Sequence, residues 1–273
     1  MIAWSDFPEG DHRTQCPACN RRDKSMGVTV LGPGHGVAHC FRCGYVETRQ
    51  TARELTPAER QAFARRMDAL KVQHDAEQRA RQAEVAAAAA IRWASSKLAA
   101  EHPYLTAKSV QPHGLRLDGR CLLVPLRDSN GTLQSLQTIG PDGDKRFLPG
   151  GRVKGCYHSI GKPGARLVVA EGYATAATIH EDTGHAVAVA FNSGNLMNVA
   201  QALRAKYPEA VLVVAADDDW QTPGNPGLTA ATEAARAVSG LLAVPDFTGL
   251  PRGPKDTDFN DLRRLAQSVE VCQ

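Results

Sequence analysis

The chain has 273 residues, of which 42% are hydrophobic and 22% charged, a composition typical of a globular protein with a sizeable core. No apolar run approaches the roughly 20 residues that a membrane-spanning helix needs. The N-terminus lacks the basic start and apolar stretch of a secretion signal. These features exclude a membrane-spanning protein, and we expect a cytoplasmic protein without a membrane partner.

The net charge is +3, but positive and negative residues are unevenly distributed along the chain. Residues 1–166 carry 25 Lys and Arg against 16 Asp and Glu, whereas residues 167–273 carry 7 against 13. A basic front suits a polyanion and an acidic back suits cations, although ordinary scatter is the alternative explanation.

The first 48 residues contain two Cys-x-x-Cys pairs, Cys16/Cys19 and Cys40/Cys43. In a chain without an export signal, paired cysteines indicate metal ligands rather than disulfides. Each pair fits a tight turn, and two pairs complete a tetrahedral thiolate site for zinc. Because protein side chains fill all four positions, we expect the zinc to be structural.

A long helical segment is predicted next. Thr56 can cap a helix, Pro57 suits its first position, and Glu59 stands where it closes a capping box. Helix formers then dominate to about residue 100, which predicts one or two long helices that act as a spacer. Two prolines in residues 102–117 interrupt the helical pattern.

The stretch Gly119–Ile139 alternates in polarity like a β-hairpin. Its predicted turn, Asp128–Gly131, ends in the Asn-Gly pair that favours tight hairpin turns.

From residue 166 onward, apolar strands alternate with helices. Strands that are continuous apolar runs separated by helices indicate a parallel sheet covered on both faces. The expected strands are residues 167–170, 186–191, 211–216 and 241–244, and the expected helices are residues 175–181, 196–207 and 228–238.

Acidic residues follow two of these strands directly. Glu171 comes after the first strand, and Asp217 and Asp219 come after the third. Ligands of open parallel sheets bind beyond the carboxyl ends of the strands, so neighbouring strands would bring these carboxylates together. A close group of carboxylates needs a cation, and oxygen ligands suit Mg²⁺ or Mn²⁺. Solvated turns or helix caps are the alternative interpretation.

The motifs around these acids resemble the Toprim domain, which bacterial-type primases, topoisomerases and some nucleases and recombination mediators share. The resemblance rests on Glu171-Gly172, on Asp217-x-Asp219 and on Gly227. It implies that Glu171, Asp217 and Asp219 are catalytic and bind the divalent ion. The strings "EGYATAATI", "FNSGNL", "NPGLTAA" and "DFNDL" further resemble plasmid conjugation primases and satellite-phage alpha-type primases.

The third acidic motif of this group has two candidates in the chain. "KDTD", Lys255–Asp258, resembles housekeeping primases, whereas "DFND" resembles the plasmid type. Asp256, Asp258 and Asp261 are therefore all candidate metal ligands, and which of them reaches the metal stays open. Lys255 is a candidate nucleotide-binding residue beside them.

The middle and the front also resemble parts of primases. "GRCLLVPLRDSNG" and "KRFLPGG" resemble the basic subdomain before Toprim, which implies that Arg120, Lys145 and Arg146 bind template or nucleotide. The cysteine module resembles the primase zinc ribbon that helps to recognise single-stranded template. There Phe41 is either a stacking face or part of the small core, and we expect the core.

These inferences predict an α/β protein in four parts: a zinc ribbon at residues 1–50, a helical spacer at 51–110, a small mixed basic subdomain at 111–165, and a Toprim parallel α/β sheet at 166–273. The expected function is that of a DNA primase making short RNA primers on single-stranded DNA by divalent-metal-dependent nucleotidyl transfer. Ribonucleoside triphosphates are the expected substrates. Because the chain has no GxxxxGK[ST] motif, a separate replicative helicase is a candidate partner.

Three alternatives remain open at this stage. A recombination-mediator-like DNA-binding protein also joins a four-cysteine module to Toprim, but it lacks the basic subdomain. A Toprim nuclease would use the same metal to cut phosphodiesters. An accessory or inhibitory protein would keep the fold without the activity.

Overall fold

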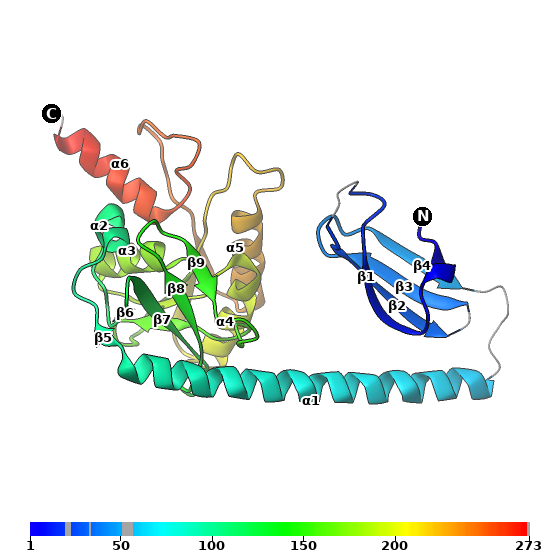
Figure 1. The fold of residues 1–273 in the computed structure, drawn as a ribbon. Helices are drawn as coiled ribbons and strands as arrows, with labels where there is room; N and C mark the ends of the chain where they lie inside the picture. The colour runs from blue at the N-terminus through cyan, green and yellow to red at the C-terminus, as the bar shows by residue number, and fades with distance from the viewer. Residues whose placement is uncertain (20–22, 33, 51–56, 272–273) are drawn as a thin grey trace. The chain divides into compact units, whose positions relative to one another are not determined.

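The computed structural model describes residues 1–19, 23–32, 34–50 and 57–271 (Figure 1). The chain divides into two compact units, residues 1–72 and 73–273. Each unit has hydrophobic clusters of its own. The expected α/β fold class is confirmed, with a four-cysteine cluster at the front and a sheet containing parallel strands at the back.

The first unit contains a four-stranded antiparallel sheet with the order β1-β2-β3-β4. Side chains alternate between its two faces, so Met26 and Val28 are buried while their neighbours are more exposed. The buried face packs with Cys16 and Cys40 into a small core. The strands are β1 (Gly10–Thr14), β2 (Met26–Gly32), β3 (His35–Cys40) and β4 (Val46–Gln50), preceded by the 3₁₀ turn Trp4–Asp6.

The expectation that Phe41 belongs to this core is wrong. Its side chain is 65% exposed. The ring lies over Gly27, where an added Cβ would come within 3.0 Å of it. Arg13 approaches the ring centre to 4.5 Å, and His39 meets it edge-on at 5.0 Å. Phe41 therefore extends the outer face of the sheet, where a cation and a second ring surround it.

Helix α1 (Pro57–Ser95) is one uninterrupted helix of 39 residues. The predicted cap, Thr56, lies outside the described residues. Toward its C-terminal end the helix packs on a neighbouring sheet through Ala89 and Trp93, which meet Leu123 and Leu136. Alanine at the contact lets the backbone approach the sheet closely. None of the helices within the described ranges is both long and apolar enough to cross a membrane.

The middle of the chain forms a five-stranded antiparallel sheet with the order β5-β6-β7-β8-β9. The predicted hairpin is confirmed: β7 pairs with β8, and the Asp128 carboxylate accepts the backbone N–H groups of Asn130 and Thr132 in the turn. The strands are β5 (Lys97–Leu98), β6 (Arg116–Asp118), β7 (Cys121–Arg127), β8 (Leu133–Ile139) and β9 (Lys145–Phe147).

A short helix, α2 (Pro103–Lys108), lies in the segment that the prolines mark as irregular. Pro103 occupies the start of the helix, where a missing N–H costs nothing. His102 caps it by accepting the Tyr104 N–H at Nδ1 over 3.2 Å. Ser109 ends it in a left-handed conformation.

The last part is a five-stranded sheet with the order β10-β12-β11-β13-β14, parallel except for β10. The predicted alternation of strands and helices is confirmed, but α6 falls where the pattern predicted no helix. The elements are β10 (His158–Ile160), β11 (Arg166–Ala170), α3 (Tyr173–Thr183), β12 (Ala186–Val189), α4 (Ser193–Lys206), β13 (Val211–Ala215), α5 (Pro226–Ala237), β14 (Leu241–Ala243) and α6 (Phe259–Val271).

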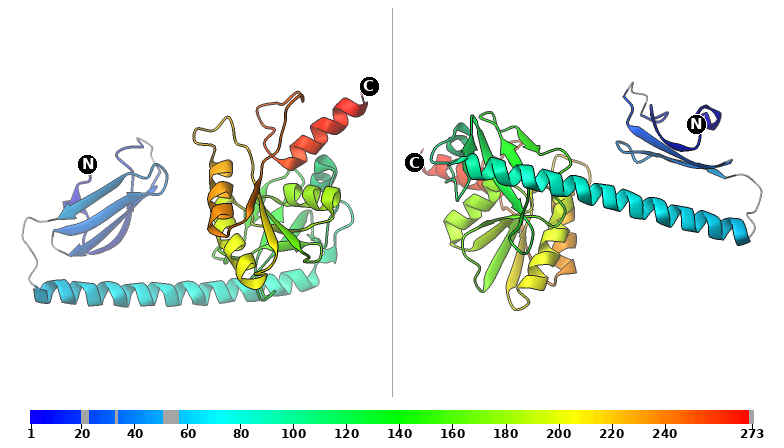
Figure 2. Two further views of the ribbon diagram at one scale, coloured as in Figure 1. Left: turned by 180° about the vertical axis from the view of Figure 1, so that it is seen from behind. Right: turned by 60° about the horizontal axis from the view of Figure 1, so that its bottom comes forward.

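Both faces of this parallel sheet are covered (Figure 2). Along β11, Val168 and Ala170 face a core shared with α3 and the hairpin β7–β8. Leu167 and Val169 face the opposite core, shared with α4 and α5. This burial on two sides explains why the strand is a continuous apolar run, and it leaves the carboxyl ends of the strands as the open edge.

His158 in β10 is a buried histidine whose Nε2 atom has no hydrogen-bond partner among the described residues. Burial, reinforced by the charges of Arg127 and His113, lowers the pKa of His158 to about 4, although a backbone hydrogen bond with His113 opposes this. The unfolded side chain takes up a proton near pH 6.5. The stability contributed by the neutral ring is therefore fully present above pH 6.5 and is lost as the pH falls toward 4.

We expect His158→Gln to reduce the acid sensitivity of the protein. The wild type should lose up to about 3 kcal/mol of unfolding free energy through this histidine between pH 7 and 4, and the variant should lose correspondingly less. Urea denaturation at several pH values measures this difference. An identical pH dependence in the two proteins would contradict it.

Candidate functional site

The acidic residues after β11 and β13 lie at the same edge of the parallel sheet. The two strands pair directly, with Val169 opposite Val214. Glu171 follows the end of β11, and Asp217 and Asp219 follow β13 closely. Parallel strands end at one edge, so this pairing brings the three carboxylates to the same edge of the sheet. We call the edge that carries Glu171, Asp217 and Asp219 the acidic crevice.

Asp217 is the most perturbed carboxylate of the crevice. Its Oδ1 atom is buried and has no hydrogen-bond partner within the described part of the chain. The pKa of Asp217 is raised to about 8, first by burial. The charges of Asp258, Glu171 and Asp219 are the next causes, and Lys145 opposes them. An ionised Asp217 thus needs positive charge nearby.

Glu171 shares this environment. Burial raises the pKa of its carboxyl group, and the negative charge of Asp219 adds to the effect. The backbone N–H of Ser193, at the start of α4, hydrogen-bonds the carboxylate and acts in the opposite direction, as does Lys145. A carboxylate with a raised pKa is a better base than a solvated one.

Asp219 is held in place by the loop that leads into α5. The Gly227 N–H donates to its Oδ2 atom over 3.1 Å. Gly227 has no room for a side chain, because an added Cβ would lie 2.6 Å from the Asp217 carbonyl oxygen and 2.9 Å from Asp219 Oδ2. The glycine is therefore required by the close approach of α5 to both acids.

Asp218 lies between Asp217 and Asp219 in the sequence, but its hydrogen bonds go to residues outside the group of acids. Arg252 donates to its Oδ2 atom over 2.8 Å and to its carbonyl oxygen over 2.9 Å. Asn225 donates to Oδ1 over 2.6 Å. These bonds connect the end of β13 to the segments before α5 and α6. Asp218 therefore stabilises the loops beside the crevice.

The three C-terminal aspartates differ in their surroundings. Asp258 is the one whose charge acts on both Asp217 and Glu171. Asp256 instead accepts the Gly253 N–H over 2.7 Å in its own turn. Asp261 is buried and accepts the Thr257 N–H over 3.1 Å.

The Asp258 carboxylate is fixed on both oxygens. Thr175, in the first turn of α3, donates to Oδ2 over 2.9 Å. The Asp261 N–H donates to Oδ1 over 2.9 Å. Asp258 is thereby attached to the helix that follows Glu171.

The four basic residues singled out from the sequence are not equivalent. Lys145 in β9 interacts with Asp258, Asp217 and Glu171, and its pKa is lowered, first by desolvation and then by the charge of Lys108. The residue is nevertheless exposed to solvent. The other three residues have exposed side chains with no contact to the acids: Arg120, Arg146, which is 3.9 Å from Asp144, and Lys255.

Two residues of α2 that the sequence reasoning missed lie beside the crevice. Lys108 Nζ is 3.5 Å from Asp261 Oδ1. The Tyr104 ring lies 5.7 Å from the Lys145 ammonium, and its hydroxyl feels the charge of Asp258. Their spacing of four residues places them on one helix face, but the prolines around α2 pointed to a loop instead.

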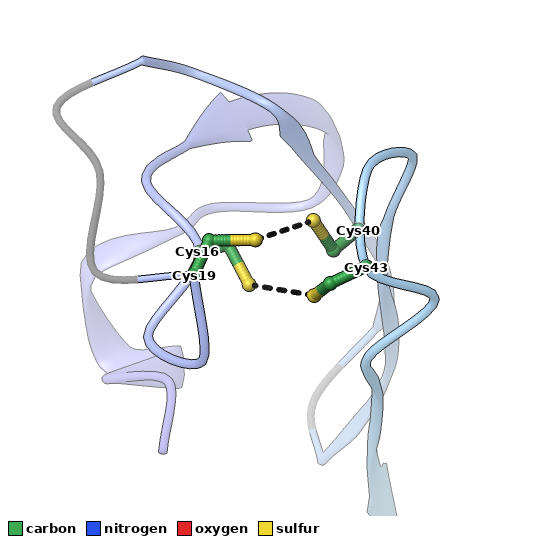
Figure 3. A group of neighbouring side chains, drawn as sticks. All are labelled: Cys16, Cys19, Cys40 and Cys43. Carbon is green, nitrogen blue, oxygen red and sulfur yellow. Dashed lines mark hydrogen bonds between the residues drawn. The ribbon is translucent and has the colours of Figure 1, made fainter. Parts of the chain in front are cut away.

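The second candidate site is the four-cysteine cluster (Figure 3). The sulfur atoms of Cys16, Cys19, Cys40 and Cys43 all lie within 4.8 Å of one another. Cys16 is 3.7 Å from Cys43, and Cys19 is 3.6 Å from Cys40. Within the described ranges, no other group of three or more Cys, His, Asp or Glu side chains lies close enough together to hold a metal ion. The carboxylates of the crevice do not meet this criterion either.

The local environment favours a thiolate at Cys40. Backbone N–H groups of Cys43 and Arg42, of which Cys43 contributes more, lower the pKa of Cys40 to about 6 against an opposing effect of burial. Thiolates are the ligands that bind zinc. The two Cys-x-x-Cys turns thus fit a tetrahedral metal ion. The Asp217 oxygen that lacks a hydrogen-bond partner lies in a group of carboxylates, which fits a hard divalent cation.

Comparisons with known proteins agree with these features. Residues 166–268 match the Toprim domain. The chain is 39% identical over 259 residues to a DNA primase TraC of Escherichia coli, a match that covers 86% of this chain and 24% of that protein. A second DNA primase TraC of Escherichia coli is 43% identical over 157 residues, covering 53% and 11%. The chain therefore spans about a quarter of the length of the first relative.

Among solved structures, the primase fragment of the bacteriophage T7 primase-helicase protein is 15% identical, with a TM-score of 0.45, over 96% of this chain and 97% of that chain. The zinc-binding and RNA polymerase domains of Aquifex aeolicus primase are 16% identical, with a TM-score of 0.34, over 96% and 79%. With TM-scores below 0.5, these two likenesses do not establish a shared fold.

We expect Gly227→Ala to lower the free energy of unfolding by about 1–3 kcal/mol, because the new methyl group overlaps the Asp217 backbone. Urea denaturation measures the change. Gly164→Ala is the matched control, since an added Cβ there meets nothing within 4 Å. Equal stability of the two variants would show that the loop before α5 moves without cost.

Proposed function

The chain contains a Toprim domain and is a homologue of the DNA primases TraC, and from this premise we propose that it synthesises short RNA primers on single-stranded DNA by divalent-metal-dependent nucleotidyl transfer. The observation that carries the proposal is Asp217, with a buried unpartnered oxygen and a pKa raised to about 8 by burial and by three further carboxylates. Ribonucleoside triphosphates and a single-stranded template are the proposed substrates.

The proposed divalent-ion ligands are Glu171, Asp217, Asp219 and Asp258. Asp258 is preferred to Asp256 and Asp261 because its charge acts on both Asp217 and Glu171. Oxygen ligands favour Mg²⁺ or Mn²⁺. When bound, such an ion would orient the triphosphate and offset the charge that develops on it.

The chain's own residues complete the proposed chemistry. Glu171, a carboxylate of raised pKa, is a metal ligand or takes the proton from the attacking 3′-hydroxyl. Lys145, whose charge interacts with those of the acids, binds the triphosphate as a point charge. Arg120, Arg146 and Lys255 are free to meet the backbone of template or nucleotide, and such contacts weaken as salt rises.

The four cysteines are proposed to hold a structural zinc ion that organises the first unit for template binding. The exposed Phe41 ring, with Arg13 beside it, offers a stacking face and a phosphate partner for a single strand. In this proposal the four parts at 1–50, 51–110, 111–165 and 166–273 keep their separate roles. A helicase on a separate chain is the proposed partner for unwinding.

Primer synthesis is the decisive test. The double variant Asp217→Ala/Asp219→Ala is expected to lower synthesis at least about 100-fold, since it removes two of the carboxylates that hold the ion, while single-strand affinity changes little. The assay combines single-stranded DNA, labelled ribonucleotides and Mg²⁺ or Mn²⁺, and resolves the products by length.

Asp246→Ala is the control, because this aspartate is exposed and bonds within its own loop to Thr248. It should retain wild-type synthesis. Synthesis that persists in the double variant would refute the metal site. A shortened template without primers would identify a nuclease instead.

Cys40→Ser is expected to release the zinc ion, because three thiolates and a hydroxyl bind zinc more weakly than four thiolates. Metal analysis should give about one zinc per chain for the wild type and much less for the variant, together with lower template affinity. Cys121→Ser, outside the cluster, should retain the metal. Equal zinc content in the two variants would contradict the assignment.

A further inference from the structure

Tyr104 of α2 is a buried tyrosine at the border between the basic subdomain and the acidic crevice. Its side chain is only 5% exposed. Its ring packs in the core that also contains Tyr173, Ala174 and Ala177 of α3. The buried hydroxyl oxygen forms no hydrogen bond of ordinary geometry within the described part of the chain.

The surroundings of this hydroxyl identify the direction in which it points. It interacts with the backbone N–H of Ala174, in the first turn of α3, and with the negative charge of Asp258. Asp258 is itself bonded to Thr175 in the same turn. The Lys145 ammonium, which acts on Asp217 and Glu171, lies 5.7 Å from the ring centre. The hydroxyl is therefore at the carboxylate edge of the crevice.

A phenol in this position is a hydrogen-bond donor. A tyrosine hydroxyl keeps its proton at neutral pH, and burial favours this neutral form further. The N–H of Ala174 can approach only the oxygen, which leaves the proton without an acceptor. A buried donor without an acceptor is costly, and phenylalanine would fill the same volume without that cost.

Tyr173 shows what a satisfied tyrosine looks like in the same core. Its side chain is 1% exposed, and its hydroxyl donates to the Gln111 carbonyl oxygen over 2.8 Å. The two rings belong to one cluster and differ in whether the hydroxyl has an acceptor among the residues that the structure describes.

Helix α2 is tied to the turn that carries Asp258. Lys108 approaches Asp261, and Asn260 donates to the Lys108 carbonyl oxygen over 2.7 Å. Asn260 also donates to Thr178 of α3 over 2.9 Å. These contacts hold Tyr104 and Asp258 in one rigid frame.

We propose that Tyr104 is a positioning residue of the acidic crevice, whose hydroxyl donates a hydrogen bond to an oxygen ligand of the divalent ion held there, a water molecule or a phosphate oxygen. The inference rests on the proposed function, because it requires an ion at Glu171, Asp217 and Asp258. The bond orients the oxygen ligand and stabilises the loaded site, in the way that groups around metal ligands usually do.

The test compares Tyr104→Phe with Tyr173→Phe, each of which removes one buried hydroxyl and keeps the ring. Calorimetric titration with Mn²⁺ alone should show affinity about three- to tenfold weaker for Tyr104→Phe if the acceptor is a metal-bound water. If the acceptor is a phosphate oxygen, the same loss should appear only in titrations of a ribonucleoside triphosphate with Mn²⁺. Tyr173→Phe should match the wild type in both titrations.

Thermal unfolding without metal supplies a second readout. Tyr104→Phe should melt at or above the wild-type temperature, because an unsatisfied buried hydroxyl is removed, whereas Tyr173→Phe should melt lower because it loses a hydrogen bond. Wild-type affinities for both ligands in Tyr104→Phe would overturn the inference. So would a melting temperature lowered as in Tyr173→Phe without any change in affinity.

Asp217→Asn separates this inference from the proposed function. Loss of Mn²⁺ binding in Asp217→Asn, with unchanged binding in Tyr104→Phe, refutes only the role of Tyr104. Unchanged Mn²⁺ binding in Asp217→Asn refutes the metal site and with it both proposals.

Discussion

The repulsion among carboxylates at the open edge of the parallel sheet is the constraint on which the rest of the second unit depends. Direct pairing of β11 with β13 brings Glu171 and Asp217 to one edge, where both are partly buried. Burial and the neighbouring negative charges disfavour the ionised form of each carboxylate there. The surrounding donors, among them Ser193, Thr175 and Gly227, hold the acids where their charges act on one another.

Elements far from this edge serve the same purpose. Asp218 and Arg252 fasten the end of β13 to the segment before α6, which contains Asp256 and Asp258, and Asp261 lies in the first turn of α6. The hairpin β7–β8 covers the sheet on the face of α3 and is followed by β9 with Lys145. The antiparallel sheet therefore supplies a cation, Lys145, to a site whose anions follow strands of the parallel sheet.

Much of this arrangement could be predicted from sequence because it depends on local patterns. Each of these patterns spans only a few residues: two Cys-x-x-Cys pairs predict a metal site, apolar runs ended by acids predict strands that lead to a site, and an Asn-Gly pair predicts a hairpin turn. The choice of Asp258 over its neighbours depends on partners as distant as Thr175, 83 residues away, and no local pattern contains that information. Tyr104 and Lys108 were missed because the prolines around α2 pointed to a loop. Phe41 was misjudged because Gly27, in β2, makes room for its ring outside the core.

The contact between Lys108 and Asp261 joins residues 153 positions apart and has a consequence for how the protein can be divided. The Toprim match begins at residue 166, after Tyr104, Lys108 and Lys145. A fragment cut at that boundary would keep every acid of the crevice but would lose Lys108, one of two cations near the buried Asp261, and Lys145, whose charge acts on Asp217. The family match thus begins at residue 166, whereas the smallest segment that contains both the acids and the lysines near them begins further upstream.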